Sequence, residues 1–304
     1  MKESEVIHAF FKGQIPPDDD CHFILPNQLV TTDSLVEGTH FLHDWSSPAQ
    51  LAEKLIEVNV SDIAASGGLP EICFLNLGLS NLSKKDEWVN DFSNAFRKKL
   101  KTHKMKLVGG DTFFSKTTHL TLTVIGTCKS HWTRSGGING DYLYLTGHIG
   151  DSELGLQCLK NQTKGKEFQR AIKKHLTPRS RSRLVESLHK FQIHACMDLT
   201  DGLIQDSQRL AFASGGELEI DMTSLPISKI AFQQLGWDGV LGSGEELELI
   251  FLSNSILPKE IDRVKITKIG SFTKSYIKRK ESSLVRFLNG NQIYHPKKIG
   301  YSHF

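Results

Sequence analysis

The sequence predicts an α+β protein with two domains, and three observations support this prediction. The chain has 304 residues, which is long enough for two domains with separate cores. Its first half predicts the element order ββαβαββ, which is typical of a sheet with helices on one face. A glycine-rich polar stretch at 133–141 then marks a change in composition, and we interpret it as a mobile linker. We therefore expect an N-terminal α+β domain over residues 1–135 and a C-terminal α/β domain over residues 136–304.

The two long helices of the first half have clear sequence signals. Ser47 is a candidate N-cap and Pro48 suits the first helical turn, so a helix is predicted over 48–67. Apolar residues at helical spacing predict an amphipathic helix over 85–104. The other elements expected in this half are a short helix at 3–12 and strands at 22–25, 28–32, 72–79, 106–108 and 119–126.

The second half predicts strands and helices in mixed order, as in an α/β domain. Apolar runs bounded by turn residues predict strands at 142–146, 195–199, 217–221, 247–252, 263–269 and 284–288. Helical patterns predict a helix that follows the turn at 147–150 and ends at 159, and further helices at 168–175, 180–191 and 203–212.

Composition excludes several classes of protein. A hydrophobic fraction of 38% and a charged fraction of 23% are those of a globular chain, not a disordered one. The net charge of +3 gives no reason to expect nucleic-acid binding, and the basic stretches 97–106 and 173–183 are interpreted as solvated helix faces. Five cysteines without a CxxC pair indicate reduced thiols. With no signal peptide and no apolar run of roughly 18 residues, we expect a cytoplasmic protein that does not enter a membrane.

One helical stretch, VNVSDIAASGG (58–68), places an amide and a carboxylate on the same face, those of Asn59 and Asp62. Its small residues would let another backbone approach closely. Taken alone, the stretch also fits a solvated helix end. Four other segments, at 18–20, 31–41, 109–112 and 198–203, place aspartates at the edges of apolar runs, most of them beside hydroxyl groups or glycines. Oxygen ligands that converge from several loops are typical of Mg²⁺ sites.

Motifs that the chain lacks narrow the chemistry further. It contains no GxxxxGK[ST] phosphate loop, no protein-kinase signature, no HExxH and no GxSxG. Dispersed aspartates, glycine turns and Arg134 remain, and together they favour metal-assisted phosphoryl transfer. No side chain stands in a convincing nucleophile setting, so a covalent phospho-enzyme is not expected.

Eight short motifs follow one another along nearly the whole chain: DDC (19–21), TTDSLVEGTHF (31–41), NVSDIAASGGLP (59–70), LVGGDT (107–112), TRSGGINGD (133–141), DLTDGL (198–203), GSGEELEL (242–249) and GYSHF (300–304). In this order they resemble the thiamine-monophosphate kinase family, within the superfamily of aminoimidazole ribonucleotide synthetase and selenophosphate synthetase. The EGTHF and GYSHF elements favour the thiamine-phosphate branch. The resemblance implies Mg²⁺-assisted transfer of phosphate from ATP to thiamine monophosphate, which gives thiamine diphosphate and ADP.

The resemblance also implies roles for individual residues. The Mg²⁺ ligands, direct or through water, would be Asp20, Thr32, Asp33, Asp62, Asp111, Asp198 and Asp201. The nucleotide contacts would be Gly110, Asp111, Arg134 and Thr200. His40 would contact the thiamine phosphate, with Glu245 and Tyr301 near the thiamine end. The residues expected to be catalytic are Asp20, Asp62, Asp111 and Asp201.

The same resemblance implies the two-domain synthetase and kinase fold of this superfamily. The N-terminal sheets of two subunits would pair in a homodimer, with each active site between the domains. Two alternatives remain open: a related ATP-dependent synthetase, or a non-catalytic protein that binds nucleotide or thiamine phosphate. The second rests on departures from the family pattern, with Asp18 in place of glycine and Glu246 in place of aspartate. Leu247 in place of tyrosine removes a ring that could stack on the substrate.

Overall fold

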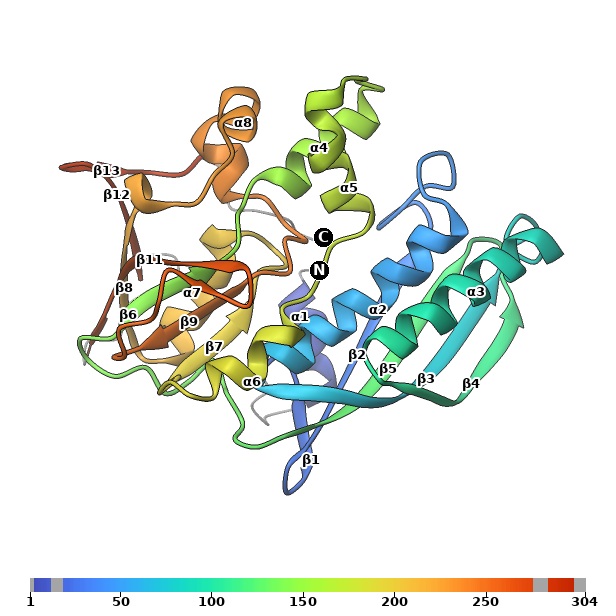
Figure 1. Cartoon of the computed structure of the whole chain (residues 1–304), viewed down its shortest axis with the longest axis horizontal. Helices are drawn as coiled ribbons and strands as arrows, with labels where there is room; N and C mark the ends of the chain where they lie inside the picture. The colour runs from blue at the N-terminus through green and yellow to red at the C-terminus, as the bar shows by residue number, and fades with distance from the viewer. Residues whose placement is uncertain (1–2, 12–18, 276–283, 298–304) are drawn as a thin grey trace.

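The computed structural model describes residues 3–11, 19–275 and 284–297, and within them it contains two sheets with helices packed on them (Figure 1). The strands up to Cys128 form a five-stranded sheet, and those from Tyr142 onward form an eight-stranded sheet. The α+β class is therefore confirmed. The proposed domain boundary at residue 135 lies in the segment that joins the two sheets.

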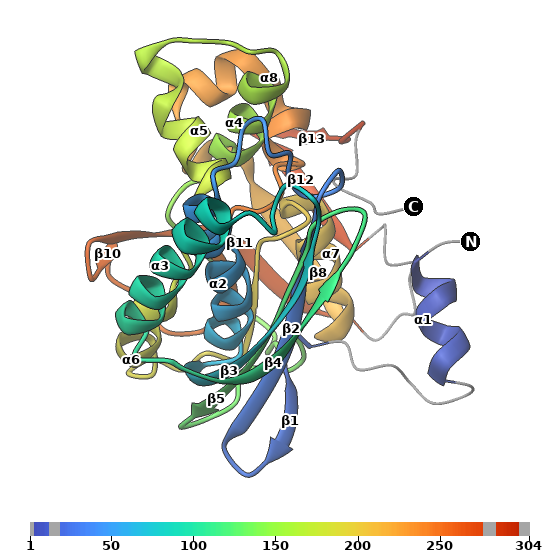
Figure 2. The same ribbon diagram turned by 90° about the vertical axis from the view of Figure 1, so that its right-hand side faces the viewer.

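The N-terminal sheet has the strand order β1-β2-β5-β3-β4, and its pairs are antiparallel except for β3 with β4. After α1 (Glu3–Phe11), its elements follow the predicted order: β1 (His22–Leu25), β2 (Gln28–Val36), α2 (Pro48–Ala65), β3 (Gly68–Leu79), α3 (Asp86–Thr102), β4 (Lys106–Phe114) and β5 (His119–Cys128). Helices α2 and α3 lie on the same side of this sheet (Figure 2). The other side carries neither of them, and it is called the open face below.

Helix α2 begins as predicted and lies at the centre of the N-terminal core. Ser47 and Gln50 exchange hydrogen bonds between side chain and backbone N–H, a capping box that satisfies N–H groups at the start of the helix. The apolar face of α2 packs with Phe92 and Phe96 of α3 against the leucines and valine of the sheet. The helix ends at Ala65, and Gly67 follows with a φ of 76°, which stops the helix as a glycine typically does.

Strands β2 and β4 run further than predicted. Because β2 continues to Val36 and β4 to Phe114, Asp33 and Asp111 lie within strands and not in loops. Strand β4 forms an edge of the sheet, and all nine of its residues are exposed. An exposed strand that contains two glycines lacks the buried apolar alternation that predicts a strand from sequence.

The C-terminal sheet has the order β13-β12-β8-β11-β6-β9-β7, with β10 paired to β11. Its strands are β6 (Tyr142–Thr146), β7 (Ala195–Asp198), β8 (Gly216–Asp221), β9 (Leu249–Ser253), β10 (Glu260–Ile261), β11 (Val264–Lys274), β12 (Val285–Asn289) and β13 (Gln292–Tyr294). The helices of this half are α4 (Asp151–Lys160), η1 (Lys166–Phe168), α5 (Gln169–Leu176), η2 (Ser182–Leu184), α6 (Val185–Leu188), α7 (Leu203–Ala213), η3 (Met222–Ser224) and α8 (Lys229–Leu241). Helices α4, α5 and α8 pack on one another (Figure 1), and Val240 and Leu241 at the end of α8 also join the core of the sheet.

From the linker onward, the structure differs from the prediction in three respects. Helix α8 has no predicted counterpart, because Gly236 interrupts it with a φ of 60° and its apolar residues keep no single helical period. The helix predicted at 180–191 is reduced to η2 and α6. The stretch predicted as a mobile linker is held in place, since Arg134 N–H donates to Asp19 and the Ser214 hydroxyl donates to the Arg134 carbonyl.

In the described part of the chain, no helix has both the length and the apolar character needed to cross a membrane. All five cysteines are buried and free of disulfide bonds, in agreement with the prediction of reduced thiols.

Candidate active site

Three carboxylates from distant segments come together, those of Asp20 before β1, Asp62 in α2 and Asp198 at the end of β7. One oxygen atom of each lies within 4.8 Å of an oxygen atom of the other two. A group of oxygen ligands at this spacing can hold a hard divalent cation such as Mg²⁺. We call these three residues the carboxylate cluster. The structure therefore brings together part of the predicted ligand set.

Strand β2 and helix α2 position Asp62. The Thr31 hydroxyl donates to Asp62 Oδ2 over 2.6 Å, and the Asp33 N–H donates to Asn59 Oδ1 over 2.9 Å. Asn59 and Asp62 thus face β2 together, as their spacing predicts. Thr31 was absent from the predicted site. The sequence feature that could have identified Thr31 is the two-residue period of a strand. This period places Thr31 and Asp33 on one face and Thr32 on the other.

Burial and mutual repulsion raise the pKa of the cluster carboxyl groups above their ordinary values. For Asp62 burial has the largest effect, and the charges of neighbouring aspartates add to it. For Asp198 burial and the charge of Asp20 raise the pKa, against the hydrogen bond that the Ser61 hydroxyl donates over 2.5 Å. A divalent cation would relieve this repulsion, so these residues fit a bound metal.

Arg134 lies at the edge of the carboxylate cluster. Its guanidinium group donates to Asp20 Oδ1 over 2.6 Å, and its backbone N–H donates to Asp19 Oδ1 over 2.7 Å. Burial still raises the pKa of Asp20, although the charge and hydrogen bond of Arg134 oppose that rise. Arg134 is therefore a fixed part of the site and not a mobile surface charge.

Two predicted nucleotide contacts lie outside the carboxylate cluster, in the edge strand β4. At Gly110 φ is 149°, and an added Cβ would lie 1.8 Å from the Leu75 carbonyl oxygen, so only glycine fits there. Asp111 is exposed, and its Oδ1 accepts the N–H of Thr112 over 2.8 Å. Thr32, another predicted ligand, points to the open face, where its hydroxyl lies 3.1 Å from that of Thr123 in β5. The carboxylate cluster of the described residues thus contains three of the six predicted aspartates, and the roles of Asp33, Asp111 and Asp201 as ligands stay predictions.

A cavity of about 800 Å³ lies next to the cluster. Five of the predicted site residues line it, namely Asp33, His40, Thr200, Asp201 and Glu245. Its remaining wall includes apolar side chains of the loop after β2 and residues of α4, α5 and α8. A concave, partly apolar site with a few converging polar groups is typical of small-molecule binding. The cavity volume is in the range of such sites.

A backbone contact sets the protonation pattern of His40. The Val36 N–H donates to His40 Nδ1 over 3.0 Å, so Nδ1 acts as an acceptor. The proton of the neutral ring is then on Nε2, which makes Nε2 a hydrogen-bond donor. A donor of this kind suits a phosphate oxygen.

Glu245 forms an ion pair that the sequence did not reveal. Lys54, buried on α2, donates to Glu245 Oε2 over 2.6 Å, and His175 lies 3.9 Å from the same oxygen. Burial would raise the pKa of Glu245, but the Lys54 charge and hydrogen bond outweigh it and lower that pKa. Burial and the Lys54 charge lower the pKa of His175 to about 4, so its ring is neutral at pH 7. Lys54 and His175 are thus residues near the cavity that were not predicted from the sequence.

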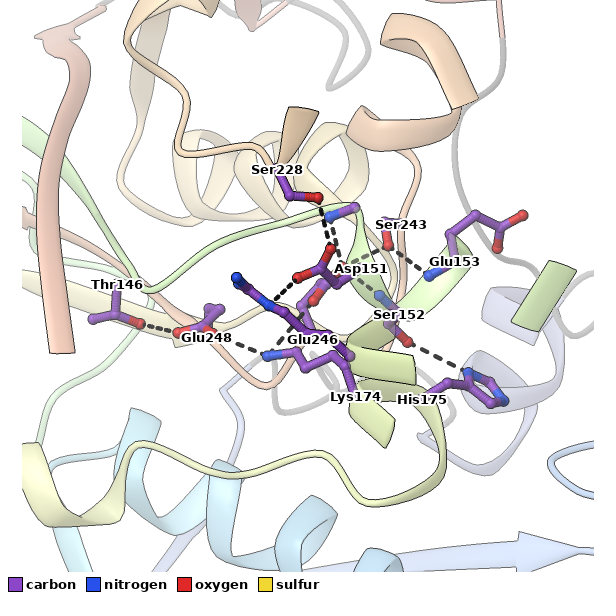
Figure 3. Close-up of polar contacts among 12 residues, drawn as sticks. Thr146, Asp151, Ser152, Glu153, Lys174, His175, Ser228, Ser243, Glu246 and Glu248 are labelled. Carbon is purple, nitrogen blue, oxygen red and sulfur yellow. Dashed lines mark hydrogen bonds and ion pairs between the residues drawn. The ribbon is translucent and has the colours of Figure 1, made fainter. Parts of the chain in front are cut away.

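Glu246 does not line the cavity, and its carboxylate holds the start of α4 (Figure 3). Its Oε1 accepts the N–H groups of Gly150 and Ser152 over 2.7 and 3.1 Å, and the Ser243 hydroxyl over 2.7 Å. A carboxylate at a helix N-terminus is stabilised by the helix dipole. Leu247, in contrast, lines the cavity. Of these two departures from the family pattern, only the one at 247 changes the cavity wall.

The prediction of a solvated basic face at 173–183 was wrong for two of its cations. Lys174 Nζ lies 3.0 Å from Glu248 Oε1, and Arg181 binds both oxygens of that fully buried carboxylate. The Thr146 hydroxyl adds a contact of 2.7 Å, and Figure 3 shows Glu248 between Thr146 and Lys174. A helical period reports which residues share a face, but not whether a buried acid lies opposite them.

One buried side chain holds the loop after β7, which carries the predicted residues Thr200 and Asp201. Asp206 Oδ2 accepts the N–H groups of Thr200, Asp201 and Gly202 over 3.0, 3.1 and 3.1 Å. Arg209 contacts both Asp206 and Asp201. Neither Asp206 nor Arg209 was predicted, although an acid in the first turn of a helix is a recognisable partner for free N–H groups.

Tyr301 and Asp18 lie outside the described residues, so the structure gives no position for either side chain.

Comparisons with known proteins agree with this architecture. The AIR synthase related protein family matches with its N-terminal domain over residues 18–128 and with its C-terminal domain over residues 139–255. Thiamine-monophosphate kinase of Leptospira interrogans (serogroup Icterohaemorrhagiae serovar Lai, strain 56601) is 44% identical over 307 residues, which cover 100% of this chain and 98% of the relative. Thiamine-monophosphate kinase of Aquifex aeolicus (strain VF5) is 32% identical over 286 residues, covering 91% of this chain and 88% of the relative.

A solved structure has the same fold along the whole chain. The structure of AaThiL complexed with AMPPCP and TMP is similar with a TM-score of 0.84 and 27% sequence identity, and the match covers 100% of this chain and 97% of that one.

Proposed function

The chain belongs to the AIR synthase related protein family, and we propose that it transfers the terminal phosphoryl group of ATP to thiamine monophosphate. The observation that carries this proposal is the carboxylate cluster beside the cavity, in a chain that is 44% identical to a thiamine-monophosphate kinase over its full length. The neighbours Asp33, Thr200 and Asp201 line the cavity. The oxygen ligands for a metal therefore lie beside the space in which a small molecule can bind.

Asp20, Asp62 and Asp198 would hold Mg²⁺, which supplies charge neutralisation for the phosphates of ATP and thiamine monophosphate. Their raised pKa values and mutual proximity support this assignment. Thr32, Asp33, Asp111 and Asp201 remain proposed ligands on the basis of the family resemblance, direct or through water.

The residues of the chain position an acceptor that is already anionic. The phosphate of thiamine monophosphate is itself the nucleophile, so the transfer requires no strong general base. His40 would donate Nε2–H to that phosphate. The carboxylate of Glu245, held by Lys54, would face the cationic thiazolium ring across the cavity.

Incubation with ATP, Mg²⁺ and either thiamine monophosphate or thiamine tests the proposal. We expect thiamine diphosphate and ADP from the monophosphate, and little or no turnover of thiamine, because the site seats an anionic acceptor. A related synthetase would consume ATP only with a different acceptor, and a non-catalytic binding protein would bind without product. Vigorous phosphorylation of thiamine, or none of the monophosphate, would contradict the proposal.

Arg134→Ala is expected to weaken ATP binding more than thiamine monophosphate binding. A charge-assisted hydrogen bond contributes roughly 1.5–3 kcal/mol, so the KM for ATP should rise by about tenfold or more. Initial rates at varied ATP and varied acceptor separate the two effects. Arg183→Ala, at an exposed arginine, is the control. If the KM for ATP is unchanged in Arg134→Ala, then Arg134 is not part of the nucleotide site.

We also propose that two copies pair through the open face of the N-terminal sheet. Phe74 and Phe113 expose 38% and 49% of their surface, and β4 is an unpaired edge in the described chain. Large exposed apolar side chains beside a free sheet edge are a typical interaction surface. In a symmetric dimer the same face of each subunit meets its copy. Asp111 and Thr32 would then lie at or near that interface.

Sedimentation measurements test the dimer. We expect Phe113→Asp to produce monomers, because a charge would be buried at the interface. Phe212→Asp, at a phenylalanine of α7 that is 55% exposed, should leave the dimer intact. A monomeric wild type, or a Phe113→Asp variant that still forms dimers, would contradict this surface.

A further inference from the structure

The guanidinium group of Arg209 forms an ion pair with the carboxylate of Asp201. Its guanidinium nitrogen lies 2.5 Å from Asp201 Oδ2 and 3.1 Å from Asp206 Oδ1. Asp206 is fully buried, whereas the side chains of Arg209 and Asp201 retain 31% and 23% of their exposure. The arginine therefore bridges a fixed acid in the core and a second acid that lines the cavity.

The position of Asp206 is determined by the backbone. Three consecutive N–H groups of the loop after β7 converge on its Oδ2. Its Oδ1 is turned toward Arg209. Because three hydrogen bonds hold Asp206, the arginine has a firm anchor on that side and a more exposed partner in Asp201 on the other. Of the two contacts, the one with Asp201 is the easier to break.

The acids of the site thus fall into two groups. Asp62 and Asp198 accept hydrogen bonds from hydroxyl groups, those of Thr31 and Ser61. Asp20 and Asp201 bind arginines instead, Arg134 and Arg209. A hydroxyl partner leaves the negative charge available to a cation, whereas a guanidinium group neutralises it. Of the two arginine-bound acids, Asp20 belongs to the carboxylate cluster of the described residues, whereas Asp201 does not.

We propose that Arg209 is a built-in counter-ion of Asp201. A divalent cation must displace Arg209 before the carboxylate of Asp201 can serve as a ligand. This inference rests on the proposed metal site and adds the order in which cations bind there. The first cation binds at the cluster, where hydroxyl groups are the partners of Asp62 and Asp198. A cation reaches Asp201 only when Arg209 moves away, and Asp206 then retains the arginine near the loop. Arg209 is a positioning residue in this scheme.

Mn²⁺ binding to the nucleotide-free protein, followed by electron paramagnetic resonance, tests the inference without any enzymatic activity. Four variants form a double-mutant cycle: wild type, Arg209→Gln, Asp201→Asn and the double variant. At a fixed, subsaturating Mn²⁺ concentration, Arg209→Gln should bind more Mn²⁺ than wild type. Loss of this partly exposed ion pair predicts an affinity gain for Mn²⁺ of roughly two- to fivefold at the site that Asp201 then completes. Arg209→Lys, which keeps the charge, should resemble wild type.

The gain must depend on Asp201, so the double variant should bind no more Mn²⁺ than Asp201→Asn alone. Thermal melts establish that each variant is folded, which matters because Arg209 is also the ion-pair partner of the buried Asp206. If Arg209→Gln binds Mn²⁺ as wild type does, or if its gain persists without Asp201, the inference is wrong. If wild type and Arg209→Gln both bind no Mn²⁺, the proposed metal site fails as well. The metal-site proposal and the inference about Arg209 can therefore fail separately, because Mn²⁺ bound to wild type is attributed to the carboxylate cluster alone.

Discussion

Asp62→Asn is expected to reduce the rate of thiamine monophosphate phosphorylation by at least about a hundredfold, since it removes a central charge of the carboxylate cluster. The substitution keeps the size of the side chain and its acceptor oxygen for the Thr31 hydroxyl. Mg²⁺ with ATP should stabilise wild type by mass action, by about 2.7 kcal/mol at a hundredfold excess over the dissociation constant. Most of that gain should be absent in the variant.

The metal-free variant should nevertheless melt no lower than wild type. Burial and neighbouring charges raise the pKa of Asp62, which means that its ionised form is disfavoured in the folded protein. Replacing that carboxylate by a neutral amide removes the repulsion. Thermal melts with and without Mg²⁺–ATP measure both effects, and Asp91→Asn, at an exposed aspartate of α3, serves as control. A wild type without a metal-dependent shift, or a variant that melts lower in metal-free buffer, would contradict the cluster.

The N-terminal sheet could be predicted because its signals are local. Ser47 and Gln50 lie three residues apart, and their capping box needs nothing from the rest of the chain. Phe92 and Phe96 mark the buried face of α3 by spacing alone. The exposed edge strand β4 lacks such a signal, which is why Asp111 was expected in a turn.

The motifs identified site residues, but not the direction in which their side chains point. Thr31 and Thr32 are adjacent and chemically alike, yet only Thr31 faces Asp62. That choice follows from the two-residue period once β2 is known to extend to Val36. Residues anchored by distant partners could not be predicted at all. Lys54 is buried because Glu245, 191 residues further along the chain, lies opposite it.

The second large effect is expected at Glu57, which joins α2 to both halves of the protein. Its carboxylate lies 2.5 Å from Lys99 Nζ and 3.2 Å from His103 Nε2, both near the end of α3. Its other oxygen accepts the N–H of Ser180, in the segment before η2, over 2.8 Å. Burial would raise the pKa of Glu57, but the hydrogen bonds and charges of His103 and Lys99 outweigh it and lower the pKa to about 2.

This shift makes stability depend on pH in a defined window. The ordinary pKa is 4.5 and the folded-state pKa is about 2, so the folded protein prefers the ionised form. The stabilisation is complete above the unfolded pKa and is lost as pH falls through the folded one. Its full size is about 3 kcal/mol, from the difference between the two pKa values.

Glu57→Gln should therefore lower the free energy of unfolding by about 3 kcal/mol at neutral pH, as expected when a buried ion pair loses one partner. Urea unfolding measures this difference, which should be about 1.4 kcal/mol smaller at about pH 3.5 than at pH 7, because the unfolded carboxyl group is then mostly protonated. Glu53→Gln is the matched control, since Glu53 lies 3.9 Å from the same lysine but its side chain is 44% exposed. Its effect should stay within about 0.5 kcal/mol. An equal loss for both variants, or a Glu57→Gln loss that does not change with pH, would show that the buried charge does not link α2 to its neighbours in this way.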